Sequence, residues 1–399
     1  MTARDEIDVR AVLDRVDLAE LVRKRGVLLK ERSGKLSGCC PFHQETTPSF
    51  FVFRHPRPGH FHCFGCSAHG DAIAFVRRLD GIGFLDAVEQ LGGPQRLTEA
   101  DRQRIRRQEA EAERRRAASQ RAKMQNAAEI WAAAGKHPVG GTAVELYLRG
   151  RGIDIDAIGG VPPVIRCGLV PYHWLDERTD PRAPRAERYR VVATPPAMVA
   201  MVQGPDGSHI ATHVTWLRVA VDGRWVKTDL ADPVTGEILP AKKIFGQYFG
   251  GSIRLTPPGP TMRGGEGIET SMTVLAALRR AGRGDAVWAL GSLGNLAGGG
   301  LGHGPKKPGT REIVNGRVRW QRRPSPVPDP ARPGFVPPPG TLRFGWLGDS
   351  DGKDPEAGRL LVERGLDRYR ALGIDAWASW AAAGMDFNDM ARKPPEGTD

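Results

Sequence analysis

The stretch FGWLGDSDGKD, residues 344–354, joins an apolar run directly to two aspartates one residue apart. The apolar run predicts a buried strand, and Asp349 and Asp351 follow its end. Asp, Ser and Gly are good turn formers, so a solvated turn would explain the stretch without any ligand. Two carboxylates this close repel each other, however, and a bound divalent cation would remove that repulsion. The surrounding sequence has to decide between a turn and a cation site.

The chain on either side of this stretch alternates between expected strands and expected helices. Strands are predicted at GPTMRGG (259–265), AVWALGS (286–292), TLRFGWLG (341–348) and IDAWASW (374–380), and helices at TSMTVLAALRRAG (270–282) and EAGRLLVERGLDRYRALG (356–373). Such alternation is typical of a parallel α/β sheet. A segment at about 297–340 interrupts it and is rich in Gly, Pro and Arg, so we expect it to be disordered or loosely packed.

Acidic residues follow three of these predicted strands. They are Glu266 after the first, Asp349 and Asp351 after the third, and Asp386 and Asp389 after the fourth. Residues just past the carboxyl ends of parallel strands converge on one edge of the sheet. Carboxylate oxygens with open positions beside them suit Mg²⁺ or Mn²⁺. The sequence therefore predicts a cation site at this edge, which would explain the two adjacent aspartates.

A second set of metal-binding residue types lies near the N-terminus. Cys40-x-x-His43 and Cys63-x-x-Cys66 are separated by nineteen residues. Thiolates and imidazole at this spacing favour a closed, four-coordinate zinc site that supports folding and has no open position for chemistry. We therefore expect one structural zinc ion.

Other residues near these pairs are alternatives for the zinc ligands. Cys39 is out of step with His43 and is interpreted as a bystander, and the lone Cys167 is interpreted as a core residue. The histidines that compete for the fourth position, without the paired spacing, are His55, His60, His62 and His69. Five cysteines, four of them clustered, indicate metal binding rather than disulfides in a chain of the cytosol.

The charge of the chain indicates the class of its partner. The net charge is +12 and the pI about 9.8, which favours a polyanion such as nucleic acid. No apolar run is long enough to span a bilayer, and the polar start MTARDEIDVR does not resemble a secretory signal. No P-loop motif of a helicase is present. We therefore expect a cytoplasmic protein that handles nucleic acid and has no membrane partner.

The segments between the two metal motifs carry weaker signals. Residues 98–130 are rich in Arg and Glu with almost no apolar face, which predicts a basic helical linker that either spaces domains or contacts DNA. Residues 131–256 predict a mixed α+β region with strands joined by Asp-Gly turns. Within it, Lys242, Lys243 and Arg254 are candidates to bind template or nucleotide phosphates, with a solvated basic hairpin as the alternative. His213, Trp216 and Trp225 are candidates for base stacking, although core packing is expected for at least one tryptophan.

Two sets of motifs carry a resemblance to known families. Residues 16–52 together with FHCFGCSAHGDAIAF (61–75) resemble the zinc-binding domain of bacterial-type DNA primases. EGIET (266–270), LGDSDGKD (347–354) and DFNDM (386–390) resemble the Toprim domain that primases share with type IA and II topoisomerases and some nucleases. The order of the two modules resembles the primases of plasmids and prophages.

The resemblance implies a multidomain α/β protein. Its parts would be a zinc ribbon domain (1–97), the basic linker (98–130), the N-terminal subdomain of a polymerase core (131–256) and a Toprim domain with a Rossmann-like parallel sheet and the insertion (257–399). The core acids of the Toprim site would be Glu266, Asp349 and Asp351, assisted by Asp386 and Asp389. The chain departs from the family pattern four residues after Glu266, where Thr270 replaces an acid and Glu269 precedes it.

The implied activity is primer synthesis. A primase joins ribonucleoside triphosphates on single-stranded DNA by two-metal nucleotidyl transfer, and its zinc domain binds the template; a replicative helicase acting in trans is a further expected partner. A Toprim nuclease is one alternative. A topoisomerase is another, although it needs a tyrosine nucleophile, and none of the five tyrosines has an active-site context. A DNA-binding replication accessory without catalysis is the third.

Overall fold

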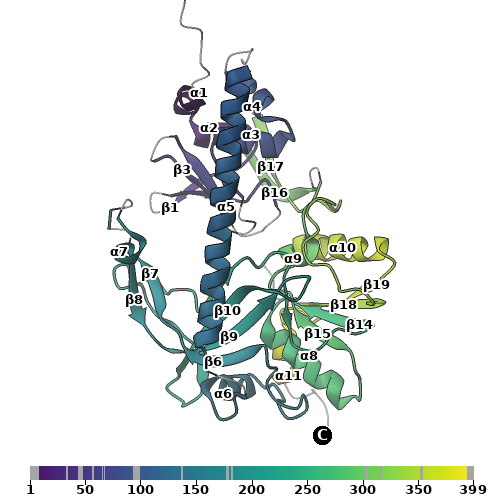
Figure 1. Cartoon of the computed structure of the whole chain (residues 1–399). Coiled ribbons are helices and arrows are strands. Elements are labelled where there is room, and N and C mark those ends of the chain that lie inside the picture. Colours follow the sequence, from purple (N-terminus) through teal and green to yellow (C-terminus); the bar gives the residue numbers. More distant parts are fainter. Residues whose placement is uncertain are drawn as a thin grey trace, which may run out of the picture. The chain divides into compact units, whose positions relative to one another are not determined.

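The computed structural model describes most of the chain (Figure 1). The described residues are 9–32, 35–43, 48–55, 58–64, 66, 68–92, 99–135, 138–176, 179–180, 183–301, 304–314, 317–350 and 354–392. Asp351 therefore lies outside the described residues. Among the described helices, none combines the length and the apolar character that crossing a membrane requires.

The chain divides into two compact units. The first comprises Met1–Ala118, Ala297–Pro333 and Glu356–Arg364, and the second comprises Ser119–Leu296, Gly334–Pro355 and Gly365–Asp399. The long helix α5 (Glu99–Ala133) contributes residues to both. Its described side chains are mostly exposed and include the i,i+4 pair Glu111–Arg115, as a charged sequence without an apolar face predicts.

A five-stranded antiparallel sheet forms the N-terminal part of the first unit. Its strands, in spatial order, are β1 (Lys30–Arg32), β2 (Lys35–Gly38), β3 (Phe50–Phe53), β4 (His60–Cys63) and β5 (His69–Gly70). The helices of this part are α1 (Val9–Arg15), α2 (Leu18–Lys24), α3 (Ala72–Asp80) and α4 (Phe84–Gln90). Phe50, Phe61 and Phe75 are buried and pack with ring centroids 5.3–6.2 Å apart. This aromatic core joins the sheet to α3.

Local sequence explains where the helices of this part begin and end. The Asp17 side chain accepts hydrogen bonds from the first amides of α2, and Asp71 does the same for α3. Gly81 ends α3 with a φ of 68°, a left-handed conformation that favours glycine. The chain therefore breaks at Gly81 and Gly83, between α3 and α4.

The insertion of the first unit is more ordered than its composition predicts. It contains the hairpin β16 (Lys306–Val314) and β17 (Arg317–Arg322), so of the two expectations, disorder or loose packing, disorder is wrong for the described residues. Arg364, on α10 (Pro355–Ala371), is fully buried. Its guanidinium donates hydrogen bonds to the carbonyls of Ala297, Gly298 and Ser325. The buried Arg364 side chain thus fixes irregular backbone, although the Gly- and Pro-rich composition of this backbone predicts loose packing.

This arrangement predicts which part of the insertion can be removed. Replacing residues 308–320 with a short Gly-Ser turn should change the melting temperature by no more than about 2 °C, because β16 and β17 pair only with each other among the described strands. The exchange removes Arg311, Arg317 and Arg319, so the salt dependence of DNA binding, followed by fluorescence anisotropy, should become weaker. Arg364→Met is the contrasting variant and should lower the melting temperature by several degrees. Loss of cooperative unfolding in the hairpin variant would contradict this assignment.

A fully antiparallel sheet forms the middle of the second unit. Its order is β11 (Trp225–Lys227), β10 (His209–Val219), β9 (Pro196–Gln203) and β6 (Ile165–Leu169), and β12 (Lys242–Gly246) also pairs with β10. The turns after β9 and β10 contain Asp206-Gly207 and Asp222-Gly223, with φ of 83° and 80° at the glycines. The predicted Asp-Gly turns are therefore present. The hairpin β7 (Tyr172–Leu175) and β8 (Tyr189–Ala193) and the helices α6 (Ala143–Gly150) and α7 (Arg185–Arg188) complete this region.

A second sheet in this unit has the predicted parallel strands. Its order is β13 (Ile253–Arg254), β15 (Ala286–Ala289), β14 (Thr261–Gly265), β18 (Arg343–Gly348) and β19 (Asp375–Trp380), and Figure 1 shows its central strands side by side. All pairs are parallel except β13 with β15. The helices α8 (Ile268–Arg280), α9 (Leu293–Ala297), α10 and α11 (Phe387–Arg392) follow its strands in the chain. The fold is thus mixed α/β.

The glycines of β14 have a packing reason. A Cβ added at Gly264 would lie 2.7 Å from the ring of Phe344 on the neighbouring strand, and one at Gly265 would meet Ser271. The strand therefore has to be poor in side chains for α8 and β18 to approach it. This explains why the segment before Glu266 looks weakly apolar in the sequence.

Candidate metal centres and nucleic-acid interface

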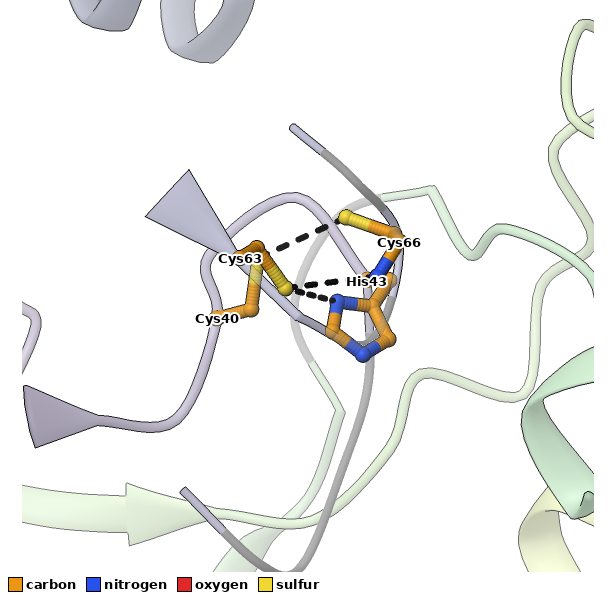
Figure 2. Close-up of side chains that lie close together, drawn as sticks. All are labelled: Cys40, His43, Cys63 and Cys66. Carbon is orange, nitrogen blue, oxygen red and sulfur yellow. Dashed lines mark hydrogen bonds between the residues drawn. The ribbon is translucent and has the colours of Figure 1, made fainter. Parts of the chain in front are cut away.

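The paired cysteine and histidine residues come together in the first unit. Cys40 and His43 lie in the loop after β2, Cys63 ends β4, and Cys66 follows it. Their ligand atoms all lie within 4.8 Å of one another, and Figure 2 shows the four side chains gathered at one point. The Cys40 and Cys66 sulfurs are 3.8 Å apart, and the Cys63 sulfur is 3.5 Å from His43 Nδ1. Three sulfurs and one imidazole in this arrangement fit a tetrahedral zinc ion.

The surroundings of the sulfurs fit a bound cation. The amide of Phe42 lies 3.4 Å from the Cys40 sulfur, and the amide of Cys66 lies 3.3 Å from the Cys63 sulfur, so both donate toward sulfur. Burial raises the pKa of the Cys40 thiol, whereas hydrogen bonds with Cys40 and Cys66 lower that of Cys63. Uncompensated thiolates crowded in a buried site would repel one another, and zinc would neutralise them.

The competing residues lie elsewhere in the same unit. Cys39 is exposed and does not join the cluster, whose four members are the only described Cys, His, Asp or Glu side chains to form such a group. His60 and His62 lie on β4, and His69 lies on β5, where the ring of His69 stacks against that of His62. His55 lies in the loop after β3. In the other unit, Cys167 packs against a hydrophobic core, as expected.

The structure places the acidic segments at one edge of the parallel sheet. Glu266 follows β14 and Asp349 follows β18, and these adjacent strands pair with Gly265 opposite Leu347. The Ser350 amide donates to the Met385 carbonyl at 2.9 Å, so the loop of Asp349 lies against the segment that leads to Asp386. The ends of β14 and β18 are therefore neighbours, and the segment before α11 lies beside the loop after β18; among the described residues, these acids do not form a group of three at metal-binding spacing.

Asp386 and Asp389 have contacts of their own. The Asp389 amide donates to Asp386 Oδ1 at 2.6 Å, so Asp386 caps α11. Asp386 also lies 3.9 Å from the Arg151 guanidinium, and Asp389 lies 4.0 Å from that of Arg392. Between them in sequence, Asn388 is fully buried. These contacts give the DFNDM segment a structural role in addition to any role toward a cation.

The structure places the three basic candidates for phosphate binding in different surroundings. Lys242 is exposed and pairs across the sheet with Thr215, on the face of β10 that also carries His213. Lys243 lies on the opposite face, where its ammonium donates to the His173 carbonyl at 2.9 Å and lies 3.8 Å from the ring centroid of Tyr172. Burial lowers the pKa of Lys243 to about 8. Lys242 and Lys243 therefore cannot act on one phosphate group from the same side.

Arg254 and the stacking candidates also have packing roles. Arg254 donates to the Gly204 carbonyl at 2.6 Å and lies 4.6 Å from the Trp288 ring centroid. Trp216 is fully buried, and its indole donates to the Val170 carbonyl at 2.8 Å. Burial, and then the charge of Lys242, lower the pKa of His213 to about 4, so this imidazole is neutral at pH 7. Core packing is therefore the observed role of Trp216.

An aromatic face on the N-terminal sheet was not anticipated from the sequence. Phe51 and Phe53 on β3 and His60 and His62 on β4 pair across the two strands, with Phe53 and His60 stacked at 4.7 Å. The ring centroids of Phe64 and His62 lie 4.4 Å apart, and Phe64 is 67% exposed. Alternation in FFVF and HFHCF could have revealed this face, because every second residue points to the same side of a strand. Rings at a surface can stack on nucleic-acid bases.

Comparison with known proteins identifies similarity in two regions. Residues 4–107 match the CHC2 zinc finger family, and residues 121–255 match a domain of unknown function (DUF7146). The N-terminal region is 44% identical over 84 residues to the DNA primase of Mycobacterium leprae, covering 21% of this chain and 13% of that protein. It is 45% identical over 91 residues to the DNA primase of Streptomyces coelicolor, covering 23% of this chain and 14% of that protein. The chain thus aligns with only a small part of these relatives.

A solved primase structure aligns with most of the chain, but the structural similarity is low. The Aquifex aeolicus primase, in its zinc-binding and RNA polymerase domains, covers 97% of this chain and 82% of its own, at 14% identity and a TM-score of 0.33. A score this low does not establish a shared fold. The sequence matches confirm the similarity to a primase zinc domain for the N-terminal region, and the Toprim resemblance stays a prediction.

Proposed function

We propose that this protein is a DNA primase that makes short RNA primers from ribonucleoside triphosphates on single-stranded DNA. The observation that carries the proposal is the N-terminal similarity to DNA primases together with the clustering of Cys40, His43, Cys63 and Cys66. The cluster and the family match support a structural zinc ion, and we assign these four side chains as its ligands. Because the site is closed by four ligands, zinc would hold the loops of the domain and take no part in bond formation.

We further propose that the parallel sheet is a Toprim domain. Glu266 and Asp349 at the ends of adjacent strands support this, and Asp351 follows in sequence. Carboxylate oxygens in this arrangement suit Mg²⁺ or Mn²⁺, which would supply charge stabilisation for nucleotidyl transfer. Glu266 and the two aspartates would hold the cations, with Glu266 as ligand or general base, and Asp386 and Asp389 would assist from their segment.

Among the basic candidates, the geometry favours Lys242. Its exposed ammonium lies on the same face as His213 and has room to neutralise phosphate. Phosphate roles for Lys243 and Arg254 stay predictions, since the contacts with His173 and Gly204 already occupy these side chains. A helicase partner and a cytoplasmic location are further parts of the proposal.

The aromatic face supports template binding by the zinc domain. Phe64→Ala should weaken binding of a single-stranded oligonucleotide by roughly fivefold to a hundredfold, because stacking on one base contributes about 1–3 kcal/mol. Fluorescence anisotropy with a labelled oligonucleotide measures the effect, and Phe64→Trp should retain it. Zinc content should stay unchanged in both variants, because Phe64 is not a ligand. Wild-type affinity in Phe64→Ala would remove this ring from the template-binding surface.

One assay tests the proposed function against its alternatives. The purified full chain is incubated with single-stranded DNA, labelled ribonucleotides and Mg²⁺. Labelled primers support the primase proposal. A shortened template supports a nuclease, and DNA binding without either product supports an accessory protein.

A further inference from the structure

Glu269 is a buried acid that the proposed reaction does not use. It lies in the first turn of α8, three residues after Glu266, and is 7% exposed. The Lys227 ammonium of β11 lies 2.6 Å from its Oε1, and the Tyr147 hydroxyl of α6 donates to the same oxygen at 2.7 Å. Two donors from separate elements of the middle region therefore converge on one oxygen of this carboxylate.

The second carboxylate oxygen and the backbone carbonyl of Glu269 have contacts as well. A Cβ added at Gly267 would lie 3.6 Å from Oε2, so this oxygen folds back over the start of α8. The Glu269 carbonyl accepts a hydrogen bond from Thr273 Oγ1 at 2.9 Å. Asn388 of α11 in turn donates to Thr273 Oγ1 at 3.0 Å and to the Arg151 carbonyl at 2.7 Å. Polar contacts thus tie the helices after Glu266 and after Asp386 to the residue that follows α6.

The charges around Glu269 keep it ionised. Burial alone would raise its pKa, but the charge and hydrogen bond of Lys227 and the hydrogen bond of Tyr147 lower it to about 2. Arg151, which faces Tyr147, and Lys242 and His213, which face the same region, complete the ionisable surroundings. A cation bound at Glu269 Oε1 would have to displace Lys227 and leave the Tyr147 hydroxyl buried without its acceptor, which is costly.

We propose that Glu269 is a positioning residue and does not bind metal. Lys227 and Tyr147 hold its carboxylate, and the carboxylate in turn holds the first turn of α8 and so the adjacent segment that presents Glu266. The proposal rests on the proposed function, because it concerns the acids of that site. It also explains why this chain departs from the Toprim pattern. Glu269, three residues after Glu266, neutralises Lys227 of the middle region.

Metal binding provides the first test. Mn²⁺ binding to the full chain, loaded with zinc, is followed by electron paramagnetic resonance. Glu269→Gln should change the Mn²⁺ affinity by less than about threefold, whereas Asp349→Asn should lower it tenfold or more. A loss in Glu269→Gln as large as that in Asp349→Asn would make Glu269 a ligand and overturn the proposal. Absence of Mn²⁺ binding in the wild type would instead count against the acidic site of the proposed function and leave the Glu269 network to the second test.

A stability cycle provides the second test. Lys227→Met should lower the melting temperature by several degrees, because it leaves a buried carboxylate without its counter-charge. The double variant Lys227→Met, Glu269→Gln should recover at least half of that loss, and Lys227→Arg should lose little. Arg218→Met with Asp229→Asn is the matched control, an exposed pair on the same sheet whose loss should shift the melting temperature little. Additive losses in the Lys227–Glu269 cycle would overturn the network.

Primer synthesis separates positioning from a purely structural role. In the stabilised double variant, kcat should stay roughly tenfold below wild type while the KM for nucleotide changes less than about twofold. Recovery of kcat together with the melting temperature would show that the network only stabilises the fold. A rise in KM at unchanged kcat would show that Lys227 binds the nucleotide itself. Either result overturns the positioning role without affecting the primase proposal.

Discussion

Asp349→Ala should abolish primer synthesis while binding of single-stranded DNA survives or improves. The carboxylate follows β18 at the edge where Glu266 follows β14, and a cation there would lose a ligand. Removing the carboxylate also removes negative charge that repels the DNA backbone. In the absence of metal, the melting temperature should rise, because like charges at one site are strained without a cation. Primer assays and anisotropy on the same preparation measure the two effects.

Related variants make this prediction specific to the cation. Asp351→Asn and Glu266→Gln should be nearly as inactive, since a neutral amide oxygen holds Mg²⁺ far less well than a carboxylate. Asp389→Ala should be milder, with a loss of about tenfold. Asp375→Asn is the matched control, because this exposed aspartate begins β19 at the opposite end of the strand. Primer synthesis at near wild-type rate by a Glu266→Gln, Asp349→Ala double variant would reduce the GDSDG stretch to a turn.

Cys63→Ser should release about one zinc ion per chain and unfold the N-terminal part of the first unit. Structural zinc contributes about 10–16 kcal/mol of apparent binding free energy in small zinc domains, so the loss of a ligand removes much of their folding free energy. Cys63 is fully buried at the end of β4, opposite Phe50 in the aromatic core, so the damage should spread into the sheet. Zinc content by atomic emission and thermal unfolding by circular dichroism measure both effects.

Variants of the other cysteines serve as controls for this experiment. Cys39→Ser and Cys167→Ser should keep their zinc, because neither residue belongs to the cluster. Cys66→Ser should behave as Cys63→Ser does. A full complement of zinc in Cys40→Ser would make Cys39 the ligand, and the assignment of the first pair would then be wrong.

Much of the fold could be predicted from local patterns. Alternating strands and helices after residue 257 predict the parallel sheet, and its strands β14, β15, β18 and β19 lie where this alternation places them. The Asp-Gly turns of the middle sheet are equally local, because glycine adopts the positive φ that they require. The order of part of the insertion could not be predicted locally, because it depends on Arg364, a residue outside the insertion itself.

The sequence by itself determined the members of the zinc-type cluster, and it located the strands that the acidic segments follow. Each depends on short spacings or on strand ends, and the chain brings such residues together once local structure forms. Only the tertiary structure decided which face of β12 carries Lys242 and which carries Lys243, because this depends on the pairing of β12 with β10. It also decided the partners of Glu269, since Tyr147 lies 122 residues away in the chain. Contacts at such separation follow from how whole elements pack, and no local pattern contains that information.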